Sequence, residues 1–311
     1  MESQPLISVL CLCYNQERFI IESLESIKAQ TYKNFEILIC DDFSKDNSVN
    51  VIESWILKNG DLRIKFLKHR ENKGITKTLN ELLKLAEGKY IQMLALDDIL
   101  MPDKFERHVQ IMEESSDNEA MVFSDAHLID SESNYYQNKF IALHMSYLNL
   151  TTQNFHELLQ YNNFIPAMSA LIKKELLDEE NGWDESLPFE DYDMWLRLSK
   201  GYSFIFDDVI SCSYRLHDNN SHKKNTVIND SAMFKVFIKH TDDQCIRNKT
   251  FFLMENLYFR KQLTDEHKIF FNKYPVKSFP EICIKNRYHS IFYRLAIKFN
   301  RLSSLFNKYT S

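Results

Sequence analysis

The sequence predicts an α/β fold in which a mainly parallel sheet is flanked by helices and followed by a helical C-terminal extension. In the first half of the chain, short apolar runs typical of buried strands alternate with segments of helical periodicity. This alternation is typical of parallel strands joined by crossover helices. The 311 residues are 44% hydrophobic and include only five Gly and six Pro, so the composition allows a large core and argues against long flexible linkers.

The strands and helices of the first half follow one another in a regular order. Apolar runs cover 6–13 and 35–40, and the segment 17–30 between them has apolar residues at helical spacing. These three segments predict a β-α-β unit. Beyond them the sequence predicts, in order, a helix over 48–59, a strand over 63–68, a helix over 76–86 and a strand over 90–96, with Gly60 and Gly88 ending the two helices.

Acid pairs follow two of these strands, Asp41-Asp42 after the second and Asp97-Asp98 after the fourth. The carboxyl ends of parallel strands share one edge of a sheet, where open α/β sheets bind ligands. Mg²⁺ and Mn²⁺ prefer such oxygen donors and also bind phosphate oxygens. An isolated acid pair after a strand is also a common helix cap. Because two pairs end neighbouring strands, the sequence favours a cation site that holds a diphosphate.

The sequence argues against several other classes of site and protein. The turn after the first strand, Tyr14-Asn15-Gln16-Glu17, has no Gly-rich dinucleotide loop, and the sequence contains no Walker loop. The net charge is −6 and the basic excess is confined to 282–311, which argues against nucleic-acid binding. The start lacks the features of a signal peptide, no apolar stretch is long enough to span a membrane, and the scattered cysteines are predicted to be reduced. We therefore expect a cytoplasmic protein.

Five segments spread over the first 130 residues resemble the family 2 glycosyltransferases, whose Rossmann-like fold is called GT-A. These segments are Ile7–Asn15, Leu24–Tyr32, Phe35–Ser44, Leu79-Asn80 with Ala86–Ile91, and Asp97-Asp98 with Met101-Pro102. Two positions depart from the family pattern. Ala95 stands where the Asp-x-Asp signature has an acid, and Phe43 stands where Gly is usual. The resemblance implies the GT-A fold and a transfer reaction, while Ala95 leaves metal dependence open.

The resemblance also implies roles for individual residues of the first half. Asp42 is expected to contact the uracil ring, with Tyr14 packing nearby. Asp97 is expected near the ribose or the metal. Asp98 is expected to hold Mn²⁺ or Mg²⁺ against the diphosphate of a UDP-sugar.

Three further residues have alternatives that the sequence leaves open. Lys77 could add positive charge near the nucleotide, or it could lie on a solvated helix face. Asn80 is expected to bond backbone beneath the site rather than a ligand. His217 belongs to the Tyr-Arg-x-His pattern, whose His closes over the diphosphate or metal in the family, although a His at a strand end is often an ordinary surface residue.

The second half is expected to supply the catalytic base. A helix over Phe189–Leu198 carries Glu190-Asp191 in its first turn, where the helix dipole favours acids even without a function. This segment resembles the family's Glu-Asp motif, which implies that Asp191 is the base. Two final strands are predicted over 203–206 and 209–215.

The predicted organisation is a GT-A catalytic domain over 1–225 and a helical C-terminal region over 226–311. The domain is expected to divide into a nucleotide-sugar half, 1–130, and an acceptor half, 131–225. In the tail, an apolar stripe formed by Ile291, Leu295, Phe299, Leu302 and Phe306 lies beside basic residues. Such a helix suits an anionic membrane surface. Docking of the stripe on the catalytic domain, or on a second subunit in a homodimer, is the alternative.

Together these features predict a metal-dependent, inverting hexosyltransferase. The expected reaction moves glucose or galactose from a UDP-sugar to a saccharide on undecaprenyl diphosphate, and forms a β-glycosidic bond in O-antigen or capsule synthesis. The enzyme is expected on the cytoplasmic face of the inner membrane, as a peripheral protein. The alternatives are a transferase that acts on a protein or soluble glycan, and a nucleotide-binding module without catalysis.

Overall fold

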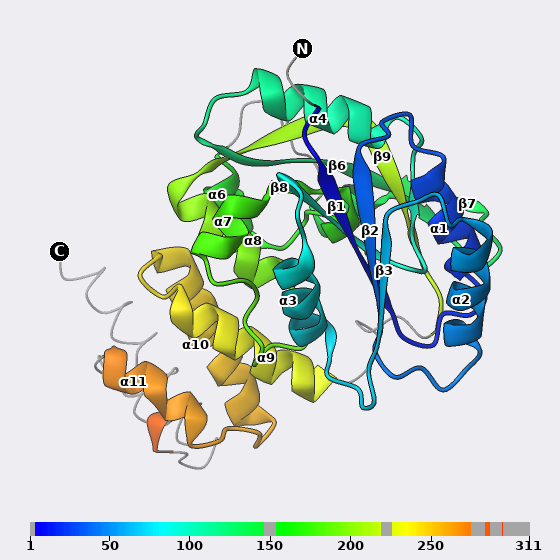
Figure 1. Cartoon of the computed structure of the whole chain (residues 1–311). Coiled ribbons are helices and arrows are strands. Elements are labelled where there is room, and N and C mark those ends of the chain that lie inside the picture. The colour runs from blue at the N-terminus through cyan, green and yellow to red at the C-terminus, as the bar shows by residue number, and fades with distance from the viewer. Residues whose placement is uncertain (1–3, 146–153, 219–225, 275–283, 287–293, 295–311) are drawn as a thin grey trace. The chain divides into compact units, whose positions relative to one another are not determined.

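The chain divides into two units, Met1–Lys224 and Asn225–Ser311. The computed structural model describes residues 4–145, 154–218, 226–274, 284–286 and 294 (Figure 1). All the site residues expected from the sequence lie in the first unit.

A mixed sheet runs through the first unit. Its strands in the described residues are β1 (Ile7–Cys13), β2 (Phe35–Asp41), β3 (Ile64–Lys68), β4 (Tyr90–Ala95), β5 (Ile99–Leu100), β6 (Glu119–Ile129), β7 (Tyr135–Lys139), β8 (Leu171–Lys173) and β9 (Ser203–Arg215). They are ordered β3-β2-β1-β4-β8-β6-β9-β5, and β7 pairs with β6.

Strands β3, β2, β1 and β4 are parallel, which confirms the predicted mainly parallel sheet. In this register Cys13 pairs with Asp41, and Leu12 pairs with Ala95. The ends of β2 and β4 therefore flank the end of β1. This places both acid pairs at one edge of the sheet, as the sequence predicted.

The second half of the sheet adds antiparallel strands. β8 runs antiparallel to β4 and β6, while β6 and β9 are parallel. The short strand β5 pairs with β9, so that Ile99 lies opposite Ser213 and the turn at Asp97-Asp98 lies next to the end of β9. The sequence analysis did not predict the short strand β5.

The two final strands expected over 203–206 and 209–215 are one continuous strand, and that prediction was wrong. Ser124 pairs with Asp207, whereas Ala126 pairs with Cys212, so β9 carries extra residues between the two pairs. Such a bulge bends a strand without ending it. The polar Asp207-Asp208 dipeptide that looked like a break between strands lies at this bulge.

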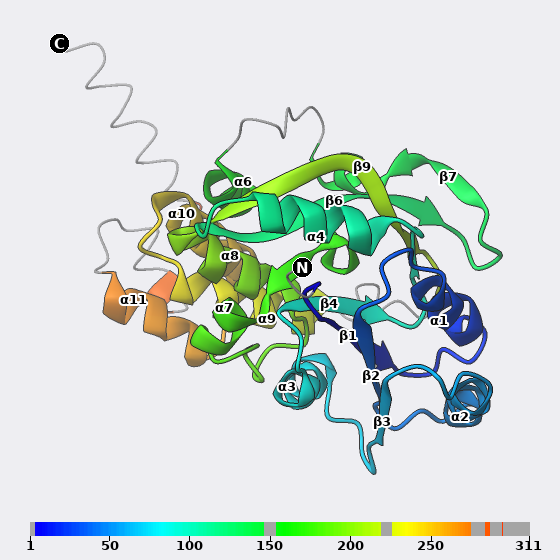
Figure 2. The ribbon, with the colours of Figure 1, turned by 45° about the horizontal axis from the view of Figure 1, so that its top comes forward.

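Helices cover both faces of the parallel strands. In the first unit they are α1 (Ile20–Lys28), α2 (Ser48–Lys58), α3 (Ile75–Leu85), α4 (Lys104–Glu114), α5 (Phe140–His144), α6 (Phe155–Tyr161), α7 (Lys174–Glu179) and α8 (Asp191–Gly201). Helices α1 and α2 lie on one side of these strands and α3 on the other (Figures 1 and 2). Alternate strand residues such as Val9 and Ile39 pack with Leu24 and Ile52 in one buried cluster.

The second unit contains helices α9 (Thr226–Lys239), α10 (Gln244–Phe259) and α11 (Ile269–Lys273). Its core gathers the buried side chains of Phe234, Met254, Tyr258, Phe270, Phe271 and Ile284. The predicted basic helix of the tail, with its apolar stripe, lies outside the described residues apart from Arg294. Among the helices that the structure describes, none combines the length and apolarity needed to cross a bilayer.

Candidate active site

The acid pair after β4 lies in a buried hydrogen-bond network. Asp97 and Asp98 are 8% and 3% exposed. Asp98 Oδ1 accepts a hydrogen bond from the backbone N–H of Arg215 over 2.9 Å, and His217 Nε2 lies 2.9 Å from Asp97 Oδ2. Burial, followed by the negative charge of Asp97, raises the pKa of Asp98 well above its ordinary value. The structure thus brings together three of the residues that the sequence analysis assigned to the diphosphate and the metal.

Arg215 ties this pair to two other parts of the unit, α1 and the turn before β7. Its side chain is 1% exposed and donates to Glu22 Oε2 on α1 over 2.6 Å. It also donates to the carbonyl oxygen of Asp97 over 2.8 Å, and to Ser133 Oγ and the carbonyl oxygen of Asp130 in the turn before β7 over 2.9 Å each. The sequence analysis noted Arg215 only as part of the pattern around His217. Its contacts make it the residue that orients the acid pair.

The carboxylates of Asp97 and Asp98 are the kind of oxygen ligand that Mg²⁺ and Mn²⁺ prefer. Such cations commonly take one or two protein carboxylates and complete their coordination with water and substrate phosphates. Two adjacent buried carboxylates repel each other, and a cation would relieve that repulsion. Among the described residues, no group of three or more His, Cys, Asp or Glu side chains is arranged so that it could hold a metal ion by itself, so water and substrate phosphate would have to supply the other ligands.

A second pair of carboxyl groups lies at the start of α8. Asn163 Nδ2 donates to Asp191 Oδ2 over 2.7 Å, and the N–H of Tyr192 donates to Asp191 Oδ1 over 2.6 Å. Burial and the charge of Asp191 raise the pKa of Glu190 to about 8. Burial also raises the pKa of Asp191, while the two hydrogen bonds lower it again. Of the two carboxyl groups, Asp191 is the one whose ionised form is favoured by hydrogen bonds from Asn163 and Tyr192.

Tyr214 on β9 lies within electrostatic reach of both pairs. Burial raises the pKa of its hydroxyl most, followed in decreasing order by Asp98, Asp97, Glu190 and Asp191. Glu190, in its ionised form, likewise raises the pKa of Asp98. Interactions between charges weaken with distance, so the pairs Asp97-Asp98 and Glu190-Asp191 belong to one electrostatic region around the end of β9.

Asp42, at the end of β2, is held by the loop that precedes α3. Its Oδ1 accepts from the N–H of Lys73 over 2.8 Å and its Oδ2 from the N–H of Gly74 over 2.9 Å. His69 Nδ1 lies 2.7 Å from Asp42 Oδ1. Local pattern did not single out His69, Lys73 or Gly74, because their contacts with Asp42 cross about 30 residues of sequence. Gly74, at φ +86°, adopts a conformation that favours glycine.

The remaining predicted residues lie around this edge of the sheet. Tyr14 follows β1 and is 46% exposed, and Lys77 lies on the exposed side of α3. Asn80 is buried on α3, where its side chain accepts from the N–H of Trp183 over 2.9 Å and donates to the carbonyl oxygen of Trp183 over 2.8 Å. These bonds confirm that Asn80 binds backbone. They anchor the loop that leads to Asp191.

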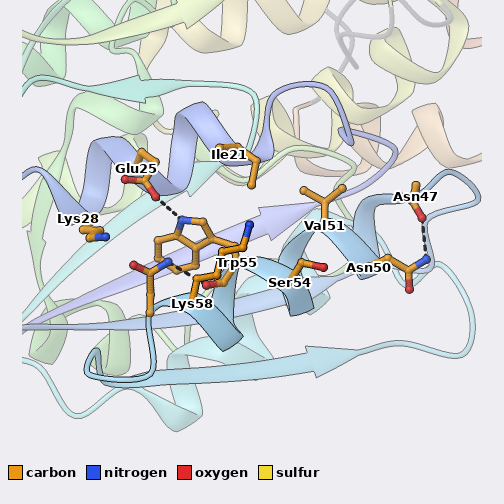
Figure 3. A pocket seen from close by; sticks show the side chains of 10 residues that line it. Ile21, Glu25, Lys28, Asn47, Asn50, Val51, Ser54, Trp55 and Lys58 are labelled. Carbon is orange, nitrogen blue, oxygen red and sulfur yellow. Dashed lines mark hydrogen bonds between the residues drawn. The ribbon is translucent and has the colours of Figure 1, made fainter.

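A pocket of about 410 Å³ lies elsewhere, between α1 and α2 (Figure 3). Trp55 forms part of its wall, and the indole N–H donates to Glu25 Oε1 over 2.6 Å. Asn59 Nδ2 donates to the carbonyl oxygen of Trp55 over 2.8 Å. None of the predicted site residues lines this pocket. It is a groove between two packed helices, separate from the carboxylate pairs.

The sequence of this chain is similar to those of known glycosyltransferases. The model of the family described as Glycosyl transferase family 2 matches residues 8–179. An uncharacterized glycosyltransferase of Rickettsia bellii is 30% identical over 249 residues, which cover 78% of this chain and 35% of that protein. The chain thus spans about a third of that relative. The Escherichia coli protein WfaP, named UDP-Glc:alpha-D-GlcNAc-diphosphoundecaprenol beta-1,3-glucosyltransferase, is 33% identical over 216 residues, covering 68% of this chain and 78% of WfaP.

Solved structures share the architecture at low sequence identity. TarS 1-349 of S. aureus in complex with UDP superposes with a TM-score of 0.64 at 16% identity, covering 96% of this chain and 91% of TarS 1-349. The mannosyltransferase PcManGT of Pyrobaculum calidifontis, in complex with GDP-Man and Mn²⁺, has a TM-score of 0.60 at 15% identity, covering 89% of this chain and 77% of PcManGT. At these identities the likeness concerns the fold.

Proposed function

Because the chain belongs to glycosyl transferase family 2 and has the GT-A fold, we propose that it is an inverting hexosyltransferase that uses a UDP-sugar. The observation that carries this proposal is the pair of carboxyl clusters around Tyr214, one with two adjacent carboxylates next to His217 and one in which Asp191 accepts two hydrogen bonds. Glucose is the preferred donor sugar, since the name of WfaP specifies UDP-Glc, with galactose as the alternative.

Asp191 acts as the base in this proposal. Its carboxylate takes the proton from the attacking hydroxyl of the acceptor, a role that typically contributes about 10²–10⁴ in rate. Burial and the charge of Asp191 raise the pKa of Glu190 to about 8, which favours the protonated form of Glu190 near neutral pH and limits the negative charge beside Asp191. Attack from the side opposite the diphosphate inverts the anomeric centre, so an α-linked donor gives a β-glycoside.

In this proposal the UDP-sugar donor binds on the side of the region around the end of β9 that lies away from Asp191. Asp98 and Asp97 would hold Mn²⁺ or Mg²⁺, with His217 beside them near the diphosphate, and Asp42 would accept a hydrogen bond from the nucleobase, with Tyr14 nearby. A bound cation supplies neutralisation of the charge that grows on the departing diphosphate. Arg215 keeps both carboxylates in place.

The acceptor of the proposal is a saccharide carried on undecaprenyl diphosphate, in O-antigen or capsule synthesis. The name of WfaP, which specifies a GlcNAc-diphosphoundecaprenol acceptor, supports this choice. Such a substrate lies at the cytoplasmic face of the inner membrane, where the basic tail is proposed to make peripheral contact. A protein or soluble glycan is the alternative acceptor.

The decisive experiment measures sugar transfer from UDP-glucose and UDP-galactose to a GlcNAc-diphosphate lipid, with Mn²⁺ or with EDTA. We expect transfer with the metal, and a loss of about 10²-fold or more in Asp191→Asn, whose UDP affinity should stay close to that of the wild type. Glu175→Gln is the matched control, because Glu175 is an exposed acid in the first turn of α7. Near-normal transfer by Asp191→Asn, or the absence of transfer by the wild type to every acceptor class, would contradict the proposal.

A further inference from the structure

We infer that His69 and Glu81 form a positioning pair that orients Asp42 and thereby selects the nucleobase of the donor. The inference rests on the proposed function, because it gives Asp42 the role of nucleobase ligand. It adds two residues from outside the resemblance. Neither is assigned to contact the substrate, and both act through Asp42.

His69 lies between two carboxylates at the end of β3. Its side chain is 4% exposed. Nδ1 is 2.7 Å from Asp42 Oδ1, and Nε2 is 3.0 Å from Glu81 Oε2 on α3. Cys40 Sγ is 3.3 Å from Nε2. The imidazole is therefore fixed at both ring nitrogens in a nearly water-free position.

Both ring nitrogens of His69 face carboxylate oxygens. With a proton on Nδ1, His69 donates to Asp42 a hydrogen bond that is charge-assisted because its acceptor is a carboxylate. Glu81 Oε2 faces the other ring nitrogen and holds the ring in this orientation.

The same residues close a ring of contacts around Asp42. Glu81 Oε1 accepts from Lys73 Nζ over 2.6 Å, and the backbone N–H of Lys73 donates to Asp42 Oδ1 over 2.8 Å. The ring thus runs from Asp42 through His69, Glu81 and Lys73 back to Asp42. A carboxylate bonded from several directions in this way has little freedom to rotate.

This arrangement limits what Asp42 can still bind. A carboxylate offers about four acceptor positions. Lys73 and His69 occupy those on Oδ1, and Gly74 occupies one on Oδ2. One position on Oδ2 therefore remains.

A single acceptor position suits uracil best. Uracil presents one ring N–H between two carbonyl oxygens. Cytosine instead presents a ring nitrogen lone pair, which a carboxylate repels, beside an amino group. Guanine presents adjacent ring N–H and amino donors, which need two acceptors side by side. A rotated Asp42 could offer both oxygens, so holding the carboxylate in one orientation creates the preference.

The test measures the affinities of the full-length protein for UDP, CDP and GDP with Mn²⁺ by calorimetry. We expect the wild type to prefer UDP. In His69→Ala, UDP affinity should fall about tenfold or more and the UDP-to-CDP preference should shrink, because a charge-assisted bond to Asp42 is lost. His69→Asn, which can still donate to Asp42, should recover part of both. Glu81→Gln, which replaces the carboxylate beside His69 Nε2, should also shrink the preference.

Lys68→Ala is the matched control, since Lys68 lies next to His69 on β3 with a side chain that is 50% exposed. It should leave both affinity and preference unchanged. If His69→Ala does not fold, the Asn and Gln variants decide the question. An unchanged UDP-to-CDP preference in these variants overturns the inference, even where UDP affinity falls. A wild type that binds no UDP overturns the proposed function instead, so the two failures are distinct.

Discussion

Asn163 Nδ2 donates a hydrogen bond to Asp191 Oδ2 over 2.7 Å, from the loop that precedes β8. A hydrogen bond to a carboxylate favours its ionised form. Burial has the opposite effect on Asp191 and raises its pKa. Asn163 therefore helps to keep the proposed base ready to accept a proton near neutral pH.

The first prediction concerns the pH dependence of Asn163→Ala. Removing the amide takes away an interaction that lowers the pKa of Asp191, so this pKa should rise. Because Asp191 must be ionised to act, the acidic limb of the kcat/KM profile should move to higher pH, and activity should recover as pH rises beyond it. Asn162→Ala, at the exposed neighbouring residue, should leave the limb in place. A pH-independent loss in Asn163→Ala would contradict this role.

A second prediction follows from the buried position of Arg215. Arg215→Met should lower the free energy of unfolding by about 3 kcal/mol or more, because it removes charge-assisted bonds to Glu22 and to the backbone at Asp97. It should also weaken Mn²⁺-dependent UDP binding, since Asp97 and Asp98 lose their anchor. Urea denaturation and calorimetry measure the two effects. Arg18→Met breaks an ion pair exposed on both sides, and should change stability by no more than about 0.5 kcal/mol.

The parallel half of the sheet was predictable because each of its features is local. Apolar runs and helical periods locate the ends of the strands and helices to within three residues, and acids directly after a strand must lie at its carboxyl end. The strand pairings in the second half of the sheet were harder to predict from the sequence. β6 and β8 pair across about 50 residues, and β9 hides a bulge that resembles a break between strands.

The same distinction separates the site residues. Asp42, Asp98 and Asp191 stand in recognisable motifs. His69 and Asn163 do not, because their importance comes from contacts with residues about 27 and 28 positions away. No periodicity or local spacing encodes such contacts, so only the folded chain identifies them.

A third prediction tests the contact between Gly182 and Asn80. Gly182 has φ +72°, and an added Cβ would lie 2.3 Å from Asn80 Oδ1. Gly182→Ala should therefore cost roughly 2–4 kcal/mol, from backbone strain and from displaced hydrogen bonds to Trp183. Gly201→Ala is the control, because a Cβ there meets open space. In an Asn80→Ala background, the cost of Gly182→Ala should fall to the backbone strain alone. Equal costs in both backgrounds would show that the two residues do not interact.

The last prediction concerns Phe43, which stands where the family pattern has Gly. Its φ is +69°, a conformation that strains any residue with a Cβ, and Lys45 Nζ lies 3.0 Å from the centre of its ring. Phe43→Ala should destabilise the protein, because it keeps the strain and loses the ring contact. Phe43→Gly loses the same contact but relieves the strain, and should be more stable than Phe43→Ala by about 1 kcal/mol in urea denaturation. Lys45→Ala measures the ring contact separately. If Phe43→Ala and Phe43→Gly were equally stable, backbone strain at this position would be negligible, and the family's preference for Gly would need another cause.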